Sequence, residues 1–197
     1  MRVVLDWDGT VTEVDALHML IERFGDAEVY AQTERALVER RMSLHDVIEV
    51  EMKTLTIPME DAVEWVREHV TVRRGFGDFA RRHRPTILSS GFRELIEPVL
   101  EREGVDLEVL ANRIEPGWVP RWRDEAQCVE CGEACKRAGL GKRPVVYVGD
   151  GYSDRCVALA ADRVFARDSL AAYLDERDVA YEPFADFDAL AAALASG

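Results

Sequence analysis

The chain has 197 residues, and 25 Lys and Arg against 38 Asp and Glu give it a formal net charge of −13 at pH 7. This length fits one domain with an insertion or two small domains, and a hydrophobic content of 48% is ordinary for a globular protein. The negative charge argues against nucleic acid and anionic membranes as partners. No apolar run is long enough to span a bilayer, and a carboxylate follows Met1 too soon for a signal peptide, so we expect a cytoplasmic protein.

Short apolar stretches recur along the chain and predict the strands of a buried sheet. The clearest are residues 2–6, 85–89 and 145–148, with a weaker one at 164–166 and a possible fifth at 179–181. Continuous apolar runs of this length are typical of parallel strands that are covered on both faces.

Between these stretches the apolar spacing changes to that of amphipathic helices. Apolar residues recur every three or four positions in residues 17–24, 95–100, 170–174 and 187–194. The alternation of strands and helices predicts an α/β fold, with a Rossmann-like parallel sheet and right-handed crossovers.

The interval between the first two predicted strands is much longer than one crossover helix requires. It spans about eighty residues, where a whole crossover usually needs a dozen or somewhat more. Helical patterns fill most of residues 29–70. We therefore expect residues 12–74 to form an inserted helical domain, and residues 1–11 and 75–197 to form the α/β core.

Acidic residues follow two of the predicted strands. Asp6 and Asp8 end the first strand, and Asp150 and Asp154 follow the strand at 145–148. Taken singly, each motif could be a helix N-cap or a solvated turn. Because parallel strands end at the same edge of a sheet, we expect all four carboxylates to converge there, where they require a cation or protons. Oxygen ligands alone favour Mg²⁺.

The strand at 85–89 ends in Ser89, Ser90 and Gly91, directly before a predicted helix. A hydroxyl group and free backbone N–H groups at a helix start form a site suited to phosphate. A nearby lysine would balance the charge, and the two candidates are Lys136 and Lys142.

Together these residues resemble a known family. Residues 6–10 and 88–92, a lysine and residues 149–154, in that order, resemble the four motifs of the haloacid dehalogenase-like (HAD) hydrolases. The helical insertion resembles the C1 cap of the phosphoserine phosphatase-like branch. Residues 131–136 and 165–168 are similar to stretches of the 2-hydroxy-3-keto-5-methylthiopentenyl-1-phosphate phosphatases, although one extra residue separates the cysteines here.

The resemblance implies a Mg²⁺-dependent phosphatase that hydrolyses a small phosphomonoester through an aspartyl-phosphate. Asp6 would be the nucleophile, and Asp8 would be the general acid and base, with its backbone carbonyl on the metal. Asp150 would complete the metal site. Asp154 would support it, either as a direct ligand of the ion or by contacting one of its ligands. An acid at position 8 favours a phosphatase over a dehalogenase.

For the substrate, the resemblance implies that Ser89, the N–H of Ser90 and Gly91 hold the phosphoryl oxygens. Lys136, favoured over Lys142, would neutralise phosphoryl charge. Asp15 would contact the substrate from the cap. Asp15 stands where phosphoserine phosphatases have glutamate, and Glu49 falls near the position of an expected arginine. Both departures weaken phosphoserine as the substrate. An aspartate at position 15 is also found in the methylthiopentenyl phosphatases, and together with residues 131–136 and 165–168 it points to a methionine-salvage enol phosphate.

Other functions stay open at this point. The chain could be another small-metabolite phosphatase or a phosphotransferase, or a phosphate-binding protein without catalysis. We expect a small phosphorylated metabolite as partner, and either a monomer or a homodimer.

Three cysteines form a separate pattern. Cys128, Cys131 and Cys135 could supply three zinc ligands, but a fourth is not evident in the sequence. Cys156 is expected to pack as a small apolar residue on a helix. The favoured interpretation is therefore that all of them are reduced thiols packed near the lysine.

Overall fold

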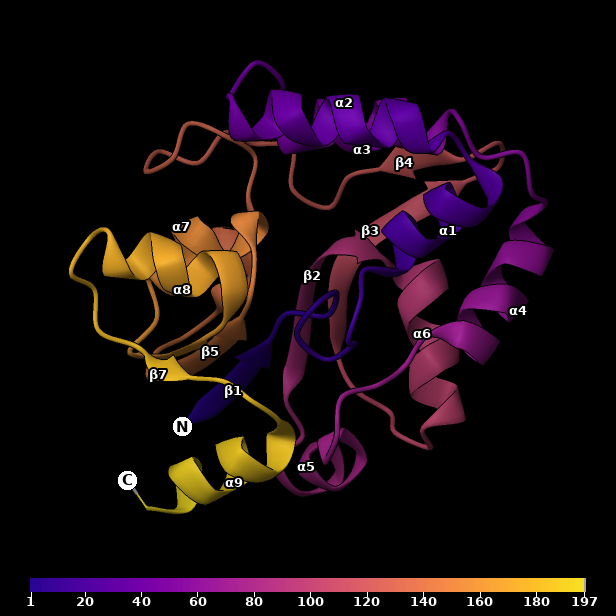
Figure 1. The fold of residues 1–197 in the computed structure, drawn as a ribbon. Coiled ribbons are helices and arrows are strands. Elements are labelled where there is room, and N and C mark those ends of the chain that lie inside the picture. Colours follow the sequence, from indigo (N-terminus) through magenta and orange to yellow (C-terminus); the bar gives the residue numbers. More distant parts are fainter. Residues whose placement is uncertain (197) are drawn as a thin grey trace.

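A computed structural model of the chain, which describes residues 1–196, has the predicted α/β architecture (Figure 1). One sheet of seven strands has the order β4-β3-β2-β1-β5-β6-β7. All neighbouring strands are parallel except β3 and β4. The strands are β1 (Arg2–Leu5), β2 (Thr86–Phe92), β3 (Val109–Glu115), β4 (Val119–Arg121), β5 (Val145–Gly149), β6 (Arg163–Ala166) and β7 (Glu182–Pro183).

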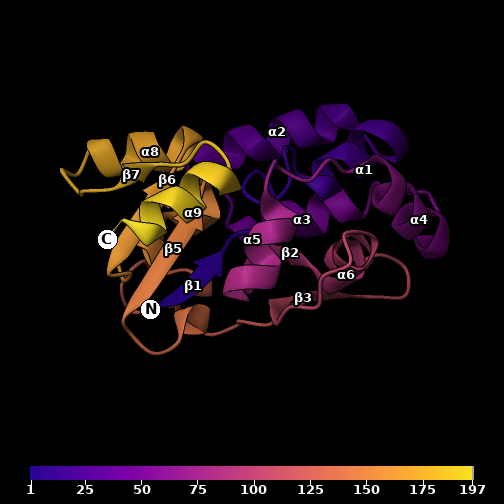
Figure 2. The ribbon, with the colours of Figure 1, turned by 90° about the horizontal axis from the view of Figure 1, so that it is seen from below.

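Helices cover both faces of the sheet, as the fully apolar strands require. Successive side chains of β5 point to opposite faces, so Val146 and Val148 join one apolar cluster and Val145 and Tyr147 join the other. The first face is covered by α5 (Phe76–His83), α6 (Arg93–Arg102) and α9 (Phe187–Ala195), and Figure 2 shows α9 beside α5. The second face is covered by η1 (Lys136–Leu140), α7 (Arg155–Ala158) and α8 (Asp168–Asp175).

Four helices lie between β1 and α5 in the chain. They are α1 (Ala16–Phe24), α2 (Ala27–Val38), α3 (Leu44–Met52) and α4 (Met59–His69). Ser43 and Asp46 form a capping box that starts α3. In Figure 1, α2 and α3 lie together over the end of the sheet toward which β1 points. None of the helices in residues 1–196 is both long and apolar enough to cross a bilayer.

The structure differs from the sequence-based expectations at both ends of the sheet. The expected strand at 179–181 is wrong, because Val179 closes the turn after α8 by donating its N–H to Leu174, and β7 begins at Glu182. The hairpin β3–β4 was not predicted, because Pro116 and Gly117 there suggest a loop. Trp118, at the turn of this hairpin, is buried and donates its indole N–H to the Ile57 carbonyl.

Candidate active site

The chain segment after β1 places two carboxylates at the edge of the sheet. Asp6 is still hydrogen-bonded to β5, through its N–H and the Val148 carbonyl at 2.9 Å. The chain then turns at Gly9, whose φ is +76°. A Cβ atom on Gly9 would collide with the Asp150 carboxylate, so only glycine allows Asp150 to come this close to the turn.

Lys136 lies between two of the predicted acidic residues. Its Nζ is 2.5 Å from Asp6 Oδ1 and 2.6 Å from Asp154 Oδ1, and the Lys136 side chain is only 1% exposed. Lys142, the other candidate, lies exposed on the surface. The structure therefore brings Lys136, and not Lys142, to the predicted carboxylates.

Both carboxylate oxygens of Asp154 contact hydrogen-bond donors or Lys136. Oδ1 accepts the Tyr147 hydroxyl at 2.5 Å, besides facing Lys136, and Oδ2 accepts the N–H groups of Asp150 and Gly151 at 2.8 and 2.9 Å. Burial disfavours the ionised form, but Lys136 and the hydrogen bonds outweigh it and lower the pKa of Asp154. Asp154 is thus a fixed anion that holds Lys136 and the chain after β5 in place.

The other carboxylates carry uncompensated charge. Burial, followed by repulsion from Asp154, raises the pKa of Asp6 well above its ordinary value. The same two causes raise the pKa of Asp150 to about 6, although the Thr10 hydroxyl donates to Asp150 Oδ1 at 2.8 Å. Lys136 alone does not balance these groups, so the arrangement calls for additional positive charge.

A divalent cation fits this arrangement. Asp6, Asp150 and Asp154 each offer an oxygen atom, and these atoms lie within 4.8 Å of one another. The donors are all carboxylate oxygens, which is the ligand chemistry of Mg²⁺. Because Asp154 already meets four donors, Asp6 and Asp150 are the better placed of the three to bind the ion directly.

Asp8 is held in the loop between β1 and α1. Its Oδ1 accepts the N–H of Ala16 at 2.9 Å, at the first turn of α1. Arg73 fastens the same loop by donating to the carbonyls of Gly9 and Thr10 at 2.8 and 2.9 Å. Burial, with a smaller contribution from Asp15, raises the pKa of Asp8 well above its ordinary value. A carboxyl group in this state can hold a proton and donate it.

The serine segment at the end of β2 faces Asp8. Ser89 Oγ accepts the N–H of Gly91 at 2.8 Å, and the Ser90 carbonyl accepts from Asn112 Nδ2 at 2.7 Å. A Cβ atom on Gly91 would lie 2.7 Å from Asp8 Oδ2, so the glycine lets the two segments approach.

A cavity of about 190 Å³ brings these groups together with helices α1–α3. Asp6, Asp8, Ser89 and Asp150 line its sheet side. Its helical side carries both apolar and acidic residues: Leu17, Leu37, Val47 and Ile48 beside Asp15, Glu34 and Glu51. Asp15 is also the N-cap of α1 and accepts the His18 N–H at 2.9 Å, a structural role that the sequence analysis did not predict.

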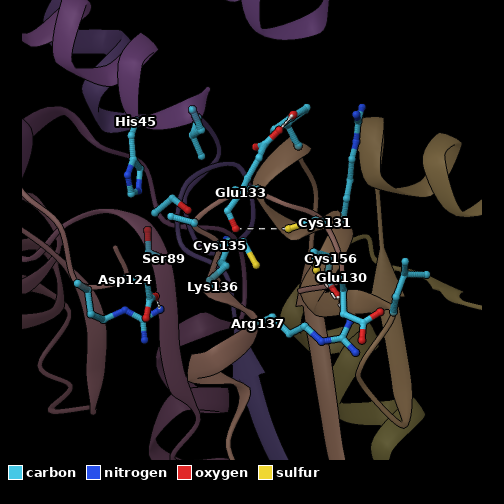
Figure 3. A pocket seen from close by; sticks show the side chains of 18 of the residues that line it. His45, Ser89, Asp124, Glu130, Cys131, Glu133, Cys135, Lys136, Arg137 and Cys156 are labelled. Carbon is cyan, nitrogen blue, oxygen red and sulfur yellow. Dashed lines mark hydrogen bonds and ion pairs between the residues drawn. The ribbon is translucent and has the colours of Figure 1, made fainter. Parts of the chain in front are cut away.

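A larger cavity of about 430 Å³ adjoins the first one, and five lining residues are common to both: Leu44, Ser89, Ser90, Tyr152 and Ser153. Figure 3 shows it between His45 of α3, Lys136 and the cysteine-containing loop. Arg123 and Arg137 make its wall more basic than that of the smaller cavity. Asp6 and Asp8, the predicted nucleophile and general acid, line the smaller cavity and do not line the larger one.

Sequence reasoning missed several residues that support the site. Tyr147 is the one hydroxyl in an otherwise apolar strand, and that contrast was a usable signal. Asn112 lies in a strand that was not predicted. Arg73 and Glu51 belong to no motif, since they come close to the site only through the fold.

Glu51 gives the free energy of unfolding a predictable pH dependence. It is 4% exposed and accepts the Thr33 hydroxyl at 2.6 Å, and burial raises its pKa to about 7. The folded state then binds the proton more tightly than the unfolded chain does, so this contribution to stability is greatest at low pH and is lost as pH rises through about 7. We expect Glu51→Gln to remove about 2 kcal/mol of the decline between pH 5 and 8, measured by urea unfolding. Glu68→Gln, at an exposed position of α4, should not change the decline; an equal effect of both substitutions would contradict the assignment.

A model of the haloacid dehalogenase-like hydrolase family matches residues 3–159. The match covers most of the chain, which therefore belongs to this family, as its motifs predict. The predicted fold and the predicted hydrolase class are confirmed with it.

Similar proteins span nearly the whole chain. A 2-hydroxy-3-keto-5-methylthiopentenyl-1-phosphate phosphatase of Exiguobacterium sibiricum is 27% identical, over 95% of this chain and 93% of its own. A protein of the same name from Lysinibacillus sphaericus is 28% identical, over 94% and 90%. A solved phosphoserine phosphatase of T. onnurineus shares the fold, with a TM-score of 0.67 and 21% identity over 96% of this chain and 91% of that one. The predicted enzyme class, a phosphoric monoester hydrolase, agrees with these names.

Proposed function

We propose that the protein hydrolyses a small phosphomonoester in two steps, with Asp6 as the nucleophile and Mg²⁺ as the cofactor. The observation that carries the proposal is the position of Asp6, which lies against Lys136 and lines the same cavity as Asp8 and Ser89. In the first step a carboxylate oxygen of Asp6 attacks phosphorus, the bond to the alcohol oxygen breaks, and an aspartyl-phosphate forms.

Asp8 moves the proton in both steps. Its raised pKa suits a carboxyl group that protonates the leaving alcohol. As a carboxylate it then takes a proton from the water that attacks the aspartyl-phosphate, which releases phosphate and restores Asp6. Arg73 and the Ala16 N–H keep Asp8 in place for both transfers.

The phosphoryl oxygens require positive charge and N–H donors. Asp6, Asp150 and the Asp8 carbonyl would hold Mg²⁺, with Asp154 behind them, and the ion would neutralise charge on the transferring group. Lys136, fixed by Asp154, adds a second positive charge beside Asp6. Ser89, the Ser90 N–H and Gly91 supply the remaining contacts from the end of β2.

The cavity restricts the substrate to a compact molecule. We propose that residues 12–74 act as a cap, because α1–α3 form one side of a cavity of about 190 Å³, which is below the range of drug-sized pockets. The apolar residues Leu17, Val47 and Ile48 suit a short carbon chain. The names of the relatives make 2-hydroxy-3-keto-5-methylthiopentenyl-1-phosphate the first substrate to test.

The test of this function is Mg²⁺-dependent release of phosphate from a panel of small esters. The panel contains that enol phosphate, phosphoserine, phosphoethanolamine and sugar phosphates. We expect release that stops with EDTA and returns with Mg²⁺. A folded protein that releases no phosphate from any ester, with or without Mg²⁺, would contradict the proposal, and a phosphorylated product formed with added alcohols would indicate a phosphotransferase.

Two variants of Asp15 separate its two roles. Asp15→Ser removes the carboxylate but keeps an N-cap oxygen, whereas Asp15→Ala removes both and should cost about 1 kcal/mol of stability. If the carboxylate contacts the substrate, both variants change the ranking of esters in kcat/KM in the same way. A ranking that changes only in Asp15→Ala, or in neither variant, would leave Asp15 with the N-cap role alone.

A further inference from the structure

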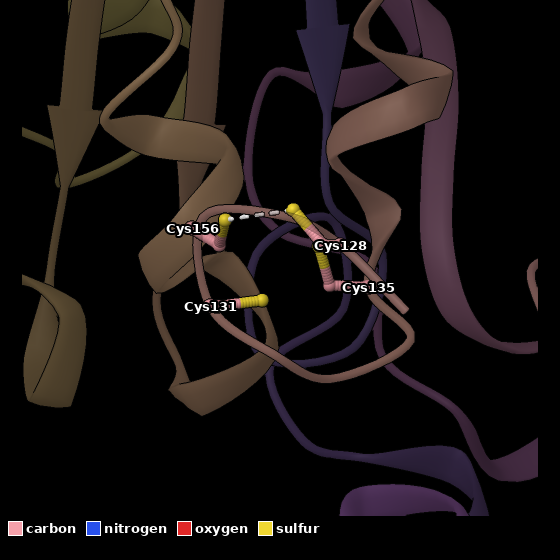
Figure 4. A group of neighbouring side chains, drawn as sticks. All are labelled: Cys128, Cys131, Cys135 and Cys156. Carbon is pink, nitrogen blue, oxygen red and sulfur yellow. Dashed lines mark hydrogen bonds between the residues drawn. The ribbon is translucent and has the colours of Figure 1, made fainter. Parts of the chain in front are cut away.

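Four cysteines converge beside the active site, three from one loop and the fourth from a separate helix. Cys128, Cys131 and Cys135 lie on the loop between β4 and η1, and Cys156 lies in α7. Their four sulfur atoms all lie within 4.8 Å of one another, and the Cys128 and Cys156 sulfurs are 3.8 Å apart. Figure 4 shows the side chains turned toward a common centre. The expectation that Cys156 only packs as a small apolar residue is therefore incomplete, because it supplies the missing fourth sulfur.

The separation of the sulfur atoms suits a single tetrahedral ion. A zinc–thiolate bond is about 2.3 Å long, so two sulfurs of a regular tetrahedron lie about 3.8 Å apart. A disulfide needs about 2.05 Å, and all four cysteines are free in the structure. Clusters that contain several iron atoms hold their thiolates farther apart than one ion does.

The loop has the backbone arrangement of a preformed ligand turn. Cys128 donates its N–H to the Glu133 carbonyl at 2.9 Å, and Gly132 donates back to the Cys128 carbonyl at 2.8 Å. Gly132 has a φ of +76°, a conformation that favours glycine. The N–H groups of Glu130 and Cys131 donate to the Cys128 sulfur. This turn therefore holds the Cys128 sulfur in a fixed position among backbone donors.

Positive charge lies next to the sulfur on the helix. Arg137 Nη1 is 3.8 Å from the Cys156 sulfur and 3.1 Å from the Cys156 carbonyl. Hydrogen bonds of this kind orient metal ligands and stabilise thiolates. A thiol that coordinates a cation loses its proton, and the Arg137 guanidinium is close enough to stabilise the resulting Cys156 thiolate.

We propose that Cys128, Cys131, Cys135 and Cys156 bind one zinc ion. Four zinc–sulfur bonds form, and the thiol protons pass to solvent. A closed set of four sulfur ligands leaves no position for substrate or water, so the site is structural.

The proposed zinc site lies where it can connect two segments that carry active-site residues. Cys135 directly precedes Lys136, and Cys156 follows Asp154 by two residues. The ion thus joins the loop that carries Lys136 to the helix that follows Asp154. It holds together, from the outside, the two chain segments that meet in the Lys136–Asp154 ion pair.

The test measures metal content and does not depend on the proposed reaction. We expect the purified full chain to contain one zinc ion per molecule by mass spectrometry, and its cobalt form to show the intense visible absorption of a tetrahedral thiolate site. Cys131→Ser and Cys156→Ala should lose most of the zinc. Val129→Ser, at a fully exposed position of the same loop, should retain it. Hydrogen exchange in residues 127–136 should become faster in the two cysteine variants only.

Several results would overturn the proposal. One such result is a folded protein that contains no zinc, although the cells that produced it were grown with zinc, and whose four thiols all react freely with a thiol reagent. A disulfide among the four cysteines, or iron in place of zinc, would also overturn it. If Cys131→Ser retained the zinc while Cys156→Ala lost it, the four-sulfur site would be wrong in its composition.

Discussion

Replacing Asp6 with asparagine should abolish turnover and leave the fold intact. The amide is a poor nucleophile, and it is also a neutral ligand where the metal site needs a charge. We expect kcat for phosphate release to fall at least about a thousand-fold, the scale of losing a nucleophile in other enzymes. The side chain keeps its shape, and it no longer repels Asp150 and Asp154 in a buried site, so thermal unfolding should occur at no lower a temperature.

Asp178→Asn is the matched control for this experiment. Asp178 is exposed in the turn after α8, with a φ of +53° that asparagine tolerates. This variant should retain full activity. An Asp6→Asn enzyme that still turned over at more than a few per cent of the normal rate would remove Asp6 from the nucleophile role. Trapping phosphate on the wild-type chain, and its absence from Asp6→Asn, would provide a second and independent readout.

Much of this site follows from strand order, which is why sequence could predict it. The carboxylates of β1 and β5 and the serines of β2 end neighbouring parallel strands, so they reach the same edge whatever the loops do. The Gly9 turn then brings Asp8 toward Gly91. These features depend on local patterns, namely apolar runs followed by small or acidic residues.

The residues that sequence did not reveal depend on long-range packing instead. Glu51 of α3 reaches Thr33 of α2 only because the two helices pack together. Cys156 joins the three loop cysteines across an interval that has no spacing rule. The strand β3 was not predicted because it mixes apolar and charged residues, and neither alternation nor a continuous apolar run marks it. Asn112, which donates to the Ser90 carbonyl, lies in this strand and was missed for the same reason.

Replacing Lys136 should have a large effect and replacing Lys142 should have almost none. The sequence left both lysines as candidates, but only Lys136 lies against Asp6 and Asp154. Lys136→Met removes the only side-chain cation that an ion pair joins to both Asp6 and Asp154 in residues 1–196, and leaves two buried carboxylates facing each other. Breaking such a buried pair from one side costs about 3–5 kcal/mol of unfolding free energy. Turnover should be lost as well, since charge on the transferring phosphoryl group loses a partner.

The loss of stability should depend on pH with a definite sign. Lys136 lowers the pKa of Asp154 and limits the rise in the pKa of Asp6. Without it, the pKa of Asp154 in the folded state should rise above that in the unfolded chain and the pKa of Asp6 should rise further, so the variant binds more protons on folding and loses more stability as pH rises. Urea unfolding without added metal should therefore show a larger deficit for Lys136→Met at pH 8 than at pH 5. Lys142→Met, which changes an exposed side chain, should stay within about 0.5 kcal/mol of the wild type at both pH values. Equal deficits for the two variants, or a deficit that does not change with pH, would mean that Lys136 does not compensate the buried carboxylates, and the charge balance of the whole site would have to be reassigned.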